Sequence, residues 1–386
     1  MPLRDWFRSP RHLIGLFALV TVGLSLLLLL FGRRLIQQEF TLGQARDEAR
    51  RSEAAELLVT RLDQALVATE EVLRDPEAMR LAAVTPDSVT LAIVGTQLEV
   101  LPYGRLLYYP VAAAGESAAD EVFAEGEALE HARNDPSQAA VFFQRLARGA
   151  DAPTKAGALV RAARNLRKSG RPDAALAVYS EAARLKTTAI GDVPTELLAR
   201  AARCSLLADL RSPELRREAL ELRDLLLDGR WRITRPAFEM YLGSASRWAG
   251  AGERPANYLL ALSAAVDAVW SSRTTASAST EASDGWVGRR WTISAGDAQF
   301  TVLSQRRGSR THALIAGPVF VQDQWKSRLA PLEARHRVRV TLQDAGQPGA
   351  GEYTRRAASD TGLPWTLVVR DATDIEAPLQ SRRGSR

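Results

Sequence analysis

Residues 13–32, LIGLFALVTVGLSLLLLLFG, contain no charged residue and no proline. At about 1.5 Å of rise per residue, twenty helical residues extend roughly 30 Å, which matches the hydrocarbon thickness of a bilayer. A helix of a soluble domain would show a polar face, whereas the polar side chains of this run are Thr21 and Ser25. The stretch therefore predicts a single transmembrane helix.

A cleaved secretory signal is the alternative interpretation of this stretch. Such a signal has a shorter apolar region followed by a cleavage site of the small-x-small type. Here the run continues directly into Phe31, Gly32, Arg33, Arg34 and Leu35. An uncleaved signal anchor is therefore favoured over a cleaved peptide.

Arginines lie on both sides of the predicted span, so the positive-inside rule does not by itself fix its orientation. The arginines before the span are Arg4, Arg8 and Arg11, and those soon after it are Arg33, Arg34, Arg46, Arg50 and Arg51. We expect residues 1–12 to form a cytoplasmic tail and the bulk of the chain to lie outside the cytoplasm, because of a resemblance given below.

The composition favours a folded protein without a nucleic-acid partner. The chain has 386 residues, 46% of them hydrophobic, which allows two or three domains with cores of their own. Its net charge of +6 arises from 51 basic and 45 acidic residues that are interspersed, as on a solvated surface. The single cysteine, Cys204, lies among apolar residues, which is typical of a small buried core residue.

Residues 35–75 are expected to form one long helix, because they are rich in Ala, Leu, Glu and Arg and end at Asp75-Pro76. A heptad-like seam is formed by Leu58, Leu62, Ala65, Thr69 and Val72. The seam has two interpretations. The helix could be the stalk of a homodimer that carries signals to the membrane, or it could pack on its own domain.

A β segment, residues 86–112, is expected next. SVTLAIVGTQLEVLP, residues 88–102, reads as a hairpin with Gly95 in its turn, and GRLLYYP follows at residues 104–110. Residues 118–270 are then helical in character, and residues 271–285, SSRTTASASTEASDG, have the composition of a flexible linker.

Within the helical region, one helix-turn-helix block resembles the tetratricopeptide (TPR) repeat. The large, small and aromatic residues that carry the resemblance are Leu159, Ala163, Leu166, Gly170, Ala175, Tyr179 and Ala182. A weaker copy, with Ala139, Phe143 and Leu146, precedes it by about 36 residues, and a third helix pair follows at residues 194–229. A helical bundle without repeats is the alternative.

Residues 286–376 are expected to form a small α+β sensor-type domain, with a helix around residues 322–336, before a basic tail at residues 377–386. Strands from residues 88–110 could belong to the same sheet. The helical region would then be an insertion between two halves of one domain.

No catalytic, cofactor or metal site is predicted. The four histidines, His12, His131, His312 and His336, show no ligand spacing, and the sequence has no HExxH, paired CxxC, GxGxxG, GxxxxGK or GxSxG motif. We therefore expect a protein that is not an enzyme and that uses no cofactor.

Two charged clusters have both a binding and a structural interpretation. The acidic residues Glu116, Asp120, Glu121, Glu125, Glu127 and Glu130 could hold a cation, but their spacing favours a solvated helix face. Arg306, Arg307 and Arg310 could clamp an anion, or they could form a solvated hairpin tip.

The order of these segments resembles the extracytoplasmic input half of certain bacterial sensor histidine kinases. The resemblance implies a second span and a cytoplasmic kinase, yet the sequence contains neither, nor a phosphoacceptor histidine block. Either the chain is truncated before the second span, or it is a stand-alone anchored receptor.

The fold class expected is a membrane-anchored α+β protein of the bacterial inner membrane, single-pass and with its bulk in the periplasm. The function expected is that of a non-catalytic sensor of a two-component system, homodimeric through residues 35–75, with an unknown ligand or protein partner. A membrane-tethered TPR scaffold for assembling envelope proteins is the alternative.

Overall fold

The computed structural model describes residues 10–81, 85–101, 105–112, 116, 118–250, 252, 258–276, 285–343 and 353–372. The chain divides into two compact units. The terminal unit comprises residues 1–64 and 326–386, and the insertion unit comprises residues 65–325. Outside the described residues lie most of the expected cytoplasmic tail, residues 277–284 of the expected linker and the basic tail.

Helix α1 (Pro10–Arg74) includes both the apolar stretch and the long helix expected after it. The helix ends where Asp75-Pro76 predicts, and the Asp75 carboxylate accepts a hydrogen bond from the Glu77 N–H at 2.9 Å. This bond caps the short helix α2 (Pro76–Leu81). The expectation of one long helix over residues 35–75 is therefore met within a longer helix.

The N-terminal part of α1 exposes a run of large apolar side chains. Their exposed fractions range from 44% at Leu16 to 73% at Phe17, and the run continues to Phe31. The side chains of residues 13–15, 18 and 32, which belong to the predicted span, are not described. Among the described residues, no helix has both the length and the apolar character that crossing a membrane requires.

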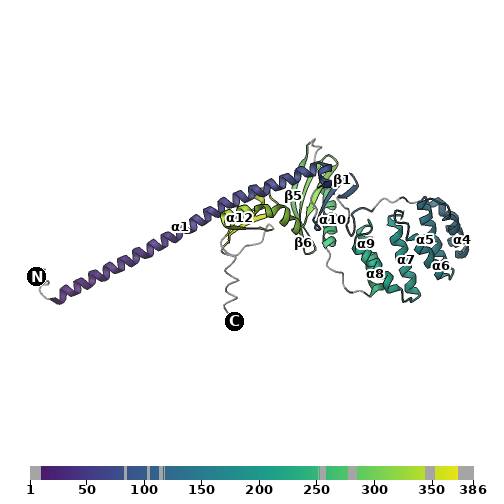
Figure 1. Ribbon diagram of the computed structural model, residues 1–386, viewed down its shortest axis with the longest axis horizontal. Helices are drawn as coiled ribbons and strands as arrows, with labels where there is room; N and C mark the ends of the chain where they lie inside the picture. Colours follow the sequence, from purple (N-terminus) through teal and green to yellow (C-terminus); the bar gives the residue numbers. More distant parts are fainter. Residues whose placement is uncertain are drawn as a thin grey trace. The chain divides into compact units, whose positions relative to one another are not determined.

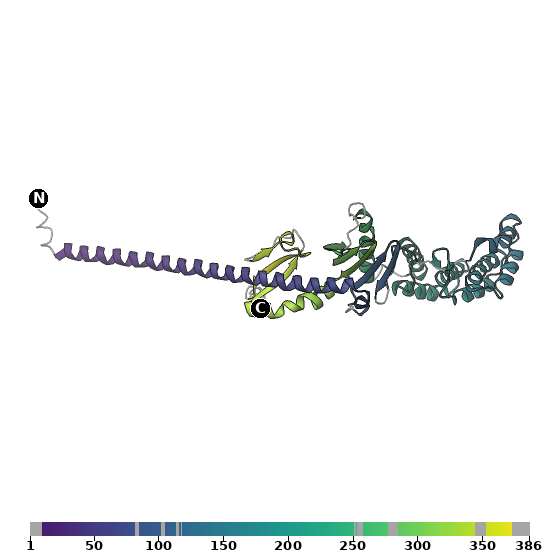
Figure 2. The ribbon, with the colours of Figure 1, turned by 90° about the horizontal axis from the view of Figure 1, so that it is seen from above.

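The terminal unit contains a three-stranded antiparallel sheet of order β8-β10-β9. Its strands are β8 (Val338–Gln343), β9 (Thr354–Arg356) and β10 (Thr366–Asp371), and its helices include α12 (Ala330–His336) and α13 (Ala358–Thr361). Figures 1 and 2 both show this sheet beside α1. Two arginines of α1, Arg50 and Arg51, each donate to the Asp371 carboxylate at 2.5 Å.

The heptad-like seam of α1 is covered by the chain itself. Leu58 and Leu62 are fully buried, and Ala65 is 4% exposed. The Thr69 hydroxyl accepts a hydrogen bond from the Trp325 indole N–H at 3.1 Å. Leu58, Leu62 and Ala65 therefore pack on the chain's own residues, as the second interpretation expects, whereas Thr69 and Val72 are half-buried.

The insertion unit contains a five-stranded antiparallel sheet of order β2-β1-β7-β6-β5. Its strands are β1 (Ser88–Val94), β2 (Gln97–Leu101), β5 (Val287–Ala295), β6 (Ala298–Arg307) and β7 (Arg310–Ala316). The early hairpin thus joins strands that follow the helical region, as the sequence suggested. The helical region is an insertion between β2 and β5.

The strands after residue 286 do not form the single sheet that was expected. Strands β5 to β7 belong to the five-stranded sheet, whereas β8 to β10 form the separate sheet of the terminal unit. β1 pairs along the whole of β7, from Ser88↔Ala316 to Val94↔Arg310. This pairing occupies the edge of β7 to which a later strand would add.

The two faces of the five-stranded sheet differ because side chains alternate along each strand. One face presents Leu91, Val302 and Ile315, which pack in one core cluster with α10 (Tyr258–Ala276). The other face presents Gln305 and His312, among other residues, and these bind the end of α1. Since α10 extends to Ala276, the first part of the expected linker 271–285 is helical.

The polar face of the sheet binds the C-terminal end of α1, where helical carbonyls have no partner within the helix. His312 Nδ1 lies 2.6 Å from the Leu73 carbonyl oxygen, so this nitrogen carries the proton. Gln305 accepts a hydrogen bond from Arg74 Nε at 3.1 Å, and Arg290 pairs with Glu70 at 2.6 Å. These contacts fix the last turns of α1 on the sheet.

The helical insertion is a succession of helices, each packed against the next (Figure 1). Its longer helices are α4 (Pro136–Leu146), α5 (Ala152–Lys168), α6 (Pro172–Ala182), α7 (Thr195–Asp209), α8 (Leu215–Leu227) and α9 (Arg235–Ala249). Three short helical segments lie before α4, at Asp120–Phe123, Ala124–Glu127 and Ala128–Ala132. Between α6 and α7 lies a hairpin of two short strands, β3 (Ala189–Ile190) and β4 (Val193–Pro194). Asp135 and Asp151 cap α4 and α5 through their side chains.

Candidate functional site

The residues that carry the TPR resemblance pack together between α5 and α6. The buried members are Leu159, Ala163, Leu166, Ala175, Tyr179 and Ala182, and they belong to one core cluster. Gly170 forms the turn with φ +75°, a conformation that favours glycine. The block is therefore a closely packed helix-turn-helix, and these residues are core residues rather than a surface that could bind a ligand.

The acidic cluster was expected to form a solvated helix face. That expectation is wrong at Glu130, whose side chain is buried. Its carboxylate accepts hydrogen bonds from Arg164 at 2.5 Å, Lys168 at 2.6 Å and Asn165 at 2.8 Å. All three donors are on α5. Spacing along one helix does not reveal this arrangement, since the partners lie more than thirty residues away.

Burial by itself would raise the pKa of Glu130. The hydrogen bonds from Arg164, Lys168 and Asn165 together outweigh burial and lower the pKa to about 2. Nearby, Glu127 pairs with Arg161 at 2.8 Å. These carboxylates therefore bind basic groups of α5, and among the described residues no group of three or more His, Cys, Asp or Glu is placed to hold a metal ion.

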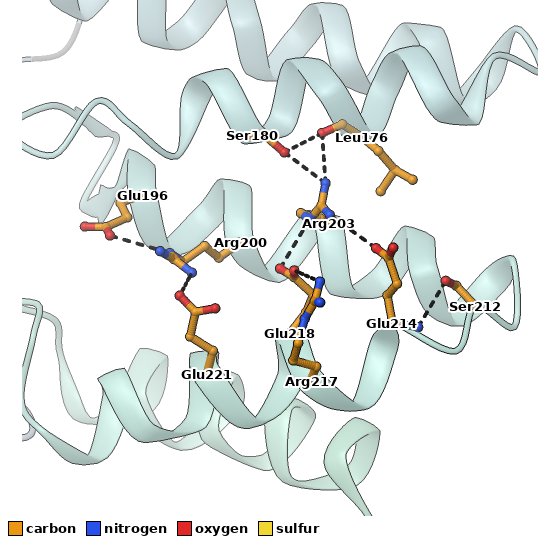
Figure 3. Close-up of polar contacts among 10 residues, drawn as sticks. All are labelled: Leu176, Ser180, Glu196, Arg200, Arg203, Ser212, Glu214, Arg217, Glu218 and Glu221. Atoms are coloured by element: carbon orange, nitrogen blue, oxygen red, sulfur yellow. Dashed lines mark hydrogen bonds and ion pairs between the residues drawn. The ribbon is translucent and has the colours of Figure 1, made fainter.

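Arginines of α7 connect the neighbouring helices α6 and α8 (Figure 3). Arg203 donates to the Ser180 hydroxyl at 2.9 Å and to the Glu218 carboxylate at 3.2 Å. One turn earlier, Arg200 binds Glu221 at 2.8 Å and lies 3.5 Å from Glu196. Each arginine thus has an acidic partner, which is the arrangement expected of a structural ion-pair network.

Glu196, in the first turn of α7, extends this network to the loop that follows α8. Its side chain is 4% exposed and lies within 3.2 Å of Arg230 Nη2. It also accepts a hydrogen bond from the indole N–H of the buried Trp231 at 3.3 Å. Glu196 therefore holds residues 229–234 in place.

A pocket of about 350 Å³ lies where this loop approaches strand β2. The residues that line it are Leu98, Glu99, Val100, Arg105, Tyr109, Gly229, Arg230 and Arg232. Its volume falls within the range of small-molecule sites. It is the candidate site, because it combines apolar side chains, an aromatic ring and three guanidinium groups.

Backbone contacts fix the two walls of the pocket relative to each other. The Tyr109 N–H donates to the Ile233 carbonyl at 2.8 Å, and the Leu107 N–H donates to the Ser263 hydroxyl of α10 at 2.9 Å. Gly229 has φ +64°, and a Cβ on it would lie 2.8 Å from the Leu106 carbonyl oxygen. A side chain at position 229 would therefore separate the two segments.

Arg232 differs from the other two arginines of the pocket because no carboxylate of the described residues pairs with it. Its Nη2 donates to the Leu98 carbonyl at 2.7 Å, and its guanidinium lies 5.1 Å from the centre of the Tyr109 ring. Its Nε is buried and has no hydrogen-bond acceptor among the described residues. A buried donor of a charged group that lacks a partner is costly.

The remaining charges of the pocket are compensated from its rim. Arg230 pairs with Glu196, and Arg105 lies 3.8 Å from Asp228 with both side chains largely exposed. Glu99 lies 3.8 Å from Arg80, also in an exposed pair. Exposed pairs at such distances are weak. The pocket therefore retains positive charge centred on Arg232.

Tyr109 is the aromatic wall of the pocket. Burial raises the pKa of its phenol, against the opposing effects of a hydrogen bond from the Leu106 N–H and of the Arg232 charge. The phenol is therefore neutral at physiological pH. A neutral ring beside an arginine offers a flat apolar surface next to a cation.

The arginines predicted as an anion clamp lie elsewhere. Arg306, Arg307 and Arg310 flank the β6–β7 turn, where Arg307 is directly opposite Arg310, and the last two are exposed. The solvated hairpin tip is therefore the interpretation that the structure supports. Cys204 is buried, as expected, and burial raises the pKa of its thiol to about 12.

Sequence reasoning did not identify the pocket residues. The sequence predicts a β segment over residues 86–112 and a helix pair that ends at Gly229, and it assigns no role to residues 230–234, RWRIT. The signal present was the alternation of Arg230 and Arg232 around Trp231 after a glycine. This signal does not show that residues 98–100, Arg105 and Tyr109 lie opposite.

Comparison with known proteins finds no match, since no family model, curated protein or solved structure is significantly similar to this chain.

Proposed function

We propose that this chain is a membrane-tethered receptor whose insertion unit binds a ligand and which has no catalytic role of its own. The observation that carries the proposal is the difference between the two ends of α1. Its residues 16–31 expose large apolar side chains, and its last turns are fixed on the five-stranded sheet. Exposed apolar runs are typical of segments that contact a lipid bilayer or a protein partner, and the proposal assigns this run to the bilayer.

The pocket supports a receptor in particular. It lies between the sheet, which holds the end of α1, and the loop that Glu196 connects to the helical insertion. A ligand there would contact both parts of the unit at once. The histidine-kinase resemblance rests on the order of segments alone, and a partner kinase on the other side of the membrane belongs to the proposal.

Topology reporters test the tether and its orientation. Alkaline phosphatase fused after Arg386 is expected to be active in bacteria, because it folds outside the cytoplasm, and a green fluorescent protein at the same position is expected to be dark. Replacing Leu24, Leu27 and Leu28 by arginine should move the protein from the membrane fraction to the soluble fraction. Replacing the exposed Leu57, Val67 and Val94 by arginine is the matched control and should leave the fractionation unchanged. An inactive phosphatase fusion together with a fluorescent green fluorescent protein fusion would contradict the extracytoplasmic placement.

A membrane-tethered scaffold is the second candidate, favoured by the succession of packed helices from α4 to α9. A photo-crosslinking residue at the exposed Val141 of α4 or Met240 of α9 distinguishes the two. A scaffold should give a defined crosslinked partner at these positions that does not depend on the pocket. A receptor should give no crosslinked partner at these two positions in the Arg232→Gln variant.

A further inference from the structure

We infer that the pocket between β2 and residues 229–232 binds a small organic anion, with an oxyanion on Arg232 and an apolar body against Tyr109. This inference rests on the proposed receptor function and specifies its ligand class. It is drawn from the one guanidinium of the pocket that has no carboxylate partner among the described residues.

The first step concerns charge. Arg232 Nη2 is bound to a neutral carbonyl, that of Leu98, and its Nε is buried without an acceptor among the described residues. A carboxylate or a phosphate ester offers two oxygens in one plane, which matches the fork of a guanidinium. Arg105 and Arg230 line the same pocket, but Arg230 is paired with Glu196 and Arg105 lies 3.8 Å from Asp228, so the positive charge of the pocket is centred on Arg232.

The second step concerns shape. A volume of about 350 Å³ admits a small molecule, and Leu98, Val100 and Tyr109 supply apolar and aromatic lining. Inorganic anions would leave these side chains unused. A ligand that joins an oxyanion to a flat or apolar body uses both halves of the pocket.

The third step concerns an alternative occupant, an extended peptide added to the edge of β2. Strand β2 is at the edge of the sheet and could accept a further strand. Arg232 already occupies the Leu98 carbonyl, which a new strand would need. The small anion is therefore favoured.

Calorimetric titration of the full-length chain, kept in mild detergent, tests the inference. Benzoate and phenyl phosphate are the probes, and their comparison tells a carboxylate from a phosphate ester. Benzamidine, which has the shape of benzoate and the opposite charge, is the matched control. We expect saturable binding of at least one anion at one site per chain and none of benzamidine. Absence of binding by both anions, or equal binding of benzamidine, would overturn the inference.

Two substitutions localise the binding. Arg232→Gln should weaken the anion at least tenfold, and Arg105→Glu, at an exposed side chain that folding does not require, should weaken it several-fold. Arg247→Glu, on α9 away from the pocket, is the control and should bind like the unchanged protein. Unchanged affinity in Arg105→Glu and in a folded Arg232→Gln would sink the assignment. A peptide with a free carboxylate that binds equally well to Arg232→Gln would instead assign the edge of β2 to peptides.

The binding experiment and the topology experiment fail independently. Titration is performed on purified protein and does not depend on the side of the membrane. If the phosphatase fusion is active but no anion binds, the receptor proposal stands and this ligand class is wrong. If anions bind but the phosphatase fusion is inactive, the ligand class stands and the extracytoplasmic location is wrong.

Discussion

Glu130 and Arg232 are both charged residues of the insertion unit, but their surroundings are opposite: Glu130 is buried, and Arg232 is half-buried at a pocket. Glu130 lies between helices and accepts hydrogen bonds from Arg164, Lys168 and Asn165. Arg232 lines a pocket, binds a backbone carbonyl, and has a buried Nε without an acceptor among the described residues. The first charge is compensated within the chain, whereas no carboxylate of the described residues compensates the second.

The difference separates a structural charge from a binding charge. A compensated buried carboxylate contributes to stability, because removing it leaves its donors without their acceptor. An uncompensated guanidinium contributes little to the folded chain and retains its capacity for an external anion. Substitutions at the two positions should therefore divide cleanly between stability and binding.

Glu130→Gln is expected to have the largest effect on stability. Lowering the pKa from its ordinary 4.5 to about 2 corresponds to ~3 kcal/mol of stabilisation, which the amide cannot provide. The matched control is Glu127→Gln, whose side chain is 39% exposed, and which should cost at most about 1 kcal/mol. Urea unfolding followed by circular dichroism measures both. Equal losses of unfolding free energy in Glu130→Gln and Glu127→Gln would contradict the structural role of Glu130.

Acid should abolish the advantage of the Glu130 carboxylate over its amide replacement. Since the pKa is lower in the folded chain, the stabilisation is complete above about pH 4.5 and is lost as the pH falls through about 2. The difference in unfolding free energy between the unchanged protein and Glu130→Gln should therefore be constant near neutral pH and shrink steadily as the pH approaches 2. A difference that does not vary between pH 5 and pH 2 would show that these partners do not lower the pKa of the carboxyl group.

Arg232→Gln should have a smaller effect on stability in the absence of ligand. The substitution removes one hydrogen bond to the Leu98 carbonyl and the contact with the Tyr109 ring, worth about 1 kcal/mol together. It also removes a buried donor that has no acceptor among the described residues, which offsets part of the loss. Urea unfolding compares it with Arg247→Gln. A loss as large as that of Glu130→Gln would make Arg232 a structural residue and erase the contrast.

The sequence predicted elements well where local pattern decides them. The C-terminal end of α1 and the β1–β2 hairpin follow from Pro76 and Gly95, and the buried helix-turn-helix follows from the residues around Gly170. The β-rich composition of residues 88–102 indicated strands, and a sheet shared with the region after residue 286 was one arrangement that the sequence left open. These features depend on spacing over a few residues.

What the sequence did not predict depends on contacts between distant segments. Glu130 lies in a run of acids whose spacing suggests solvent, and its burial arises from α5, 34 residues further along. The pocket arises because residues 98–100, Arg105 and Tyr109 meet residues of the loop after α8, and its central contact joins Leu98 to Arg232, 134 residues further along. No local pattern reveals that β1 takes the free edge of β7 while β8 to β10 form a sheet of their own.

Arg310→Glu should have the smallest effect. It adds to the comparison an exposed arginine that pairs with no carboxylate among the described residues. Arg307 and Arg310 are opposite each other at the exposed tip of the β6–β7 hairpin. Like charges at directly opposed positions are unfavourable, so the reversal should stabilise the chain by about 0.2–1 kcal/mol and should leave anion binding unchanged. Thermal unfolding and the benzoate titration check both expectations. If the substitution weakened anion binding, charge anywhere on this unit would suffice for the ligand, and the special position of Arg232, at a pocket and beside an apolar wall, would no longer be needed to explain it.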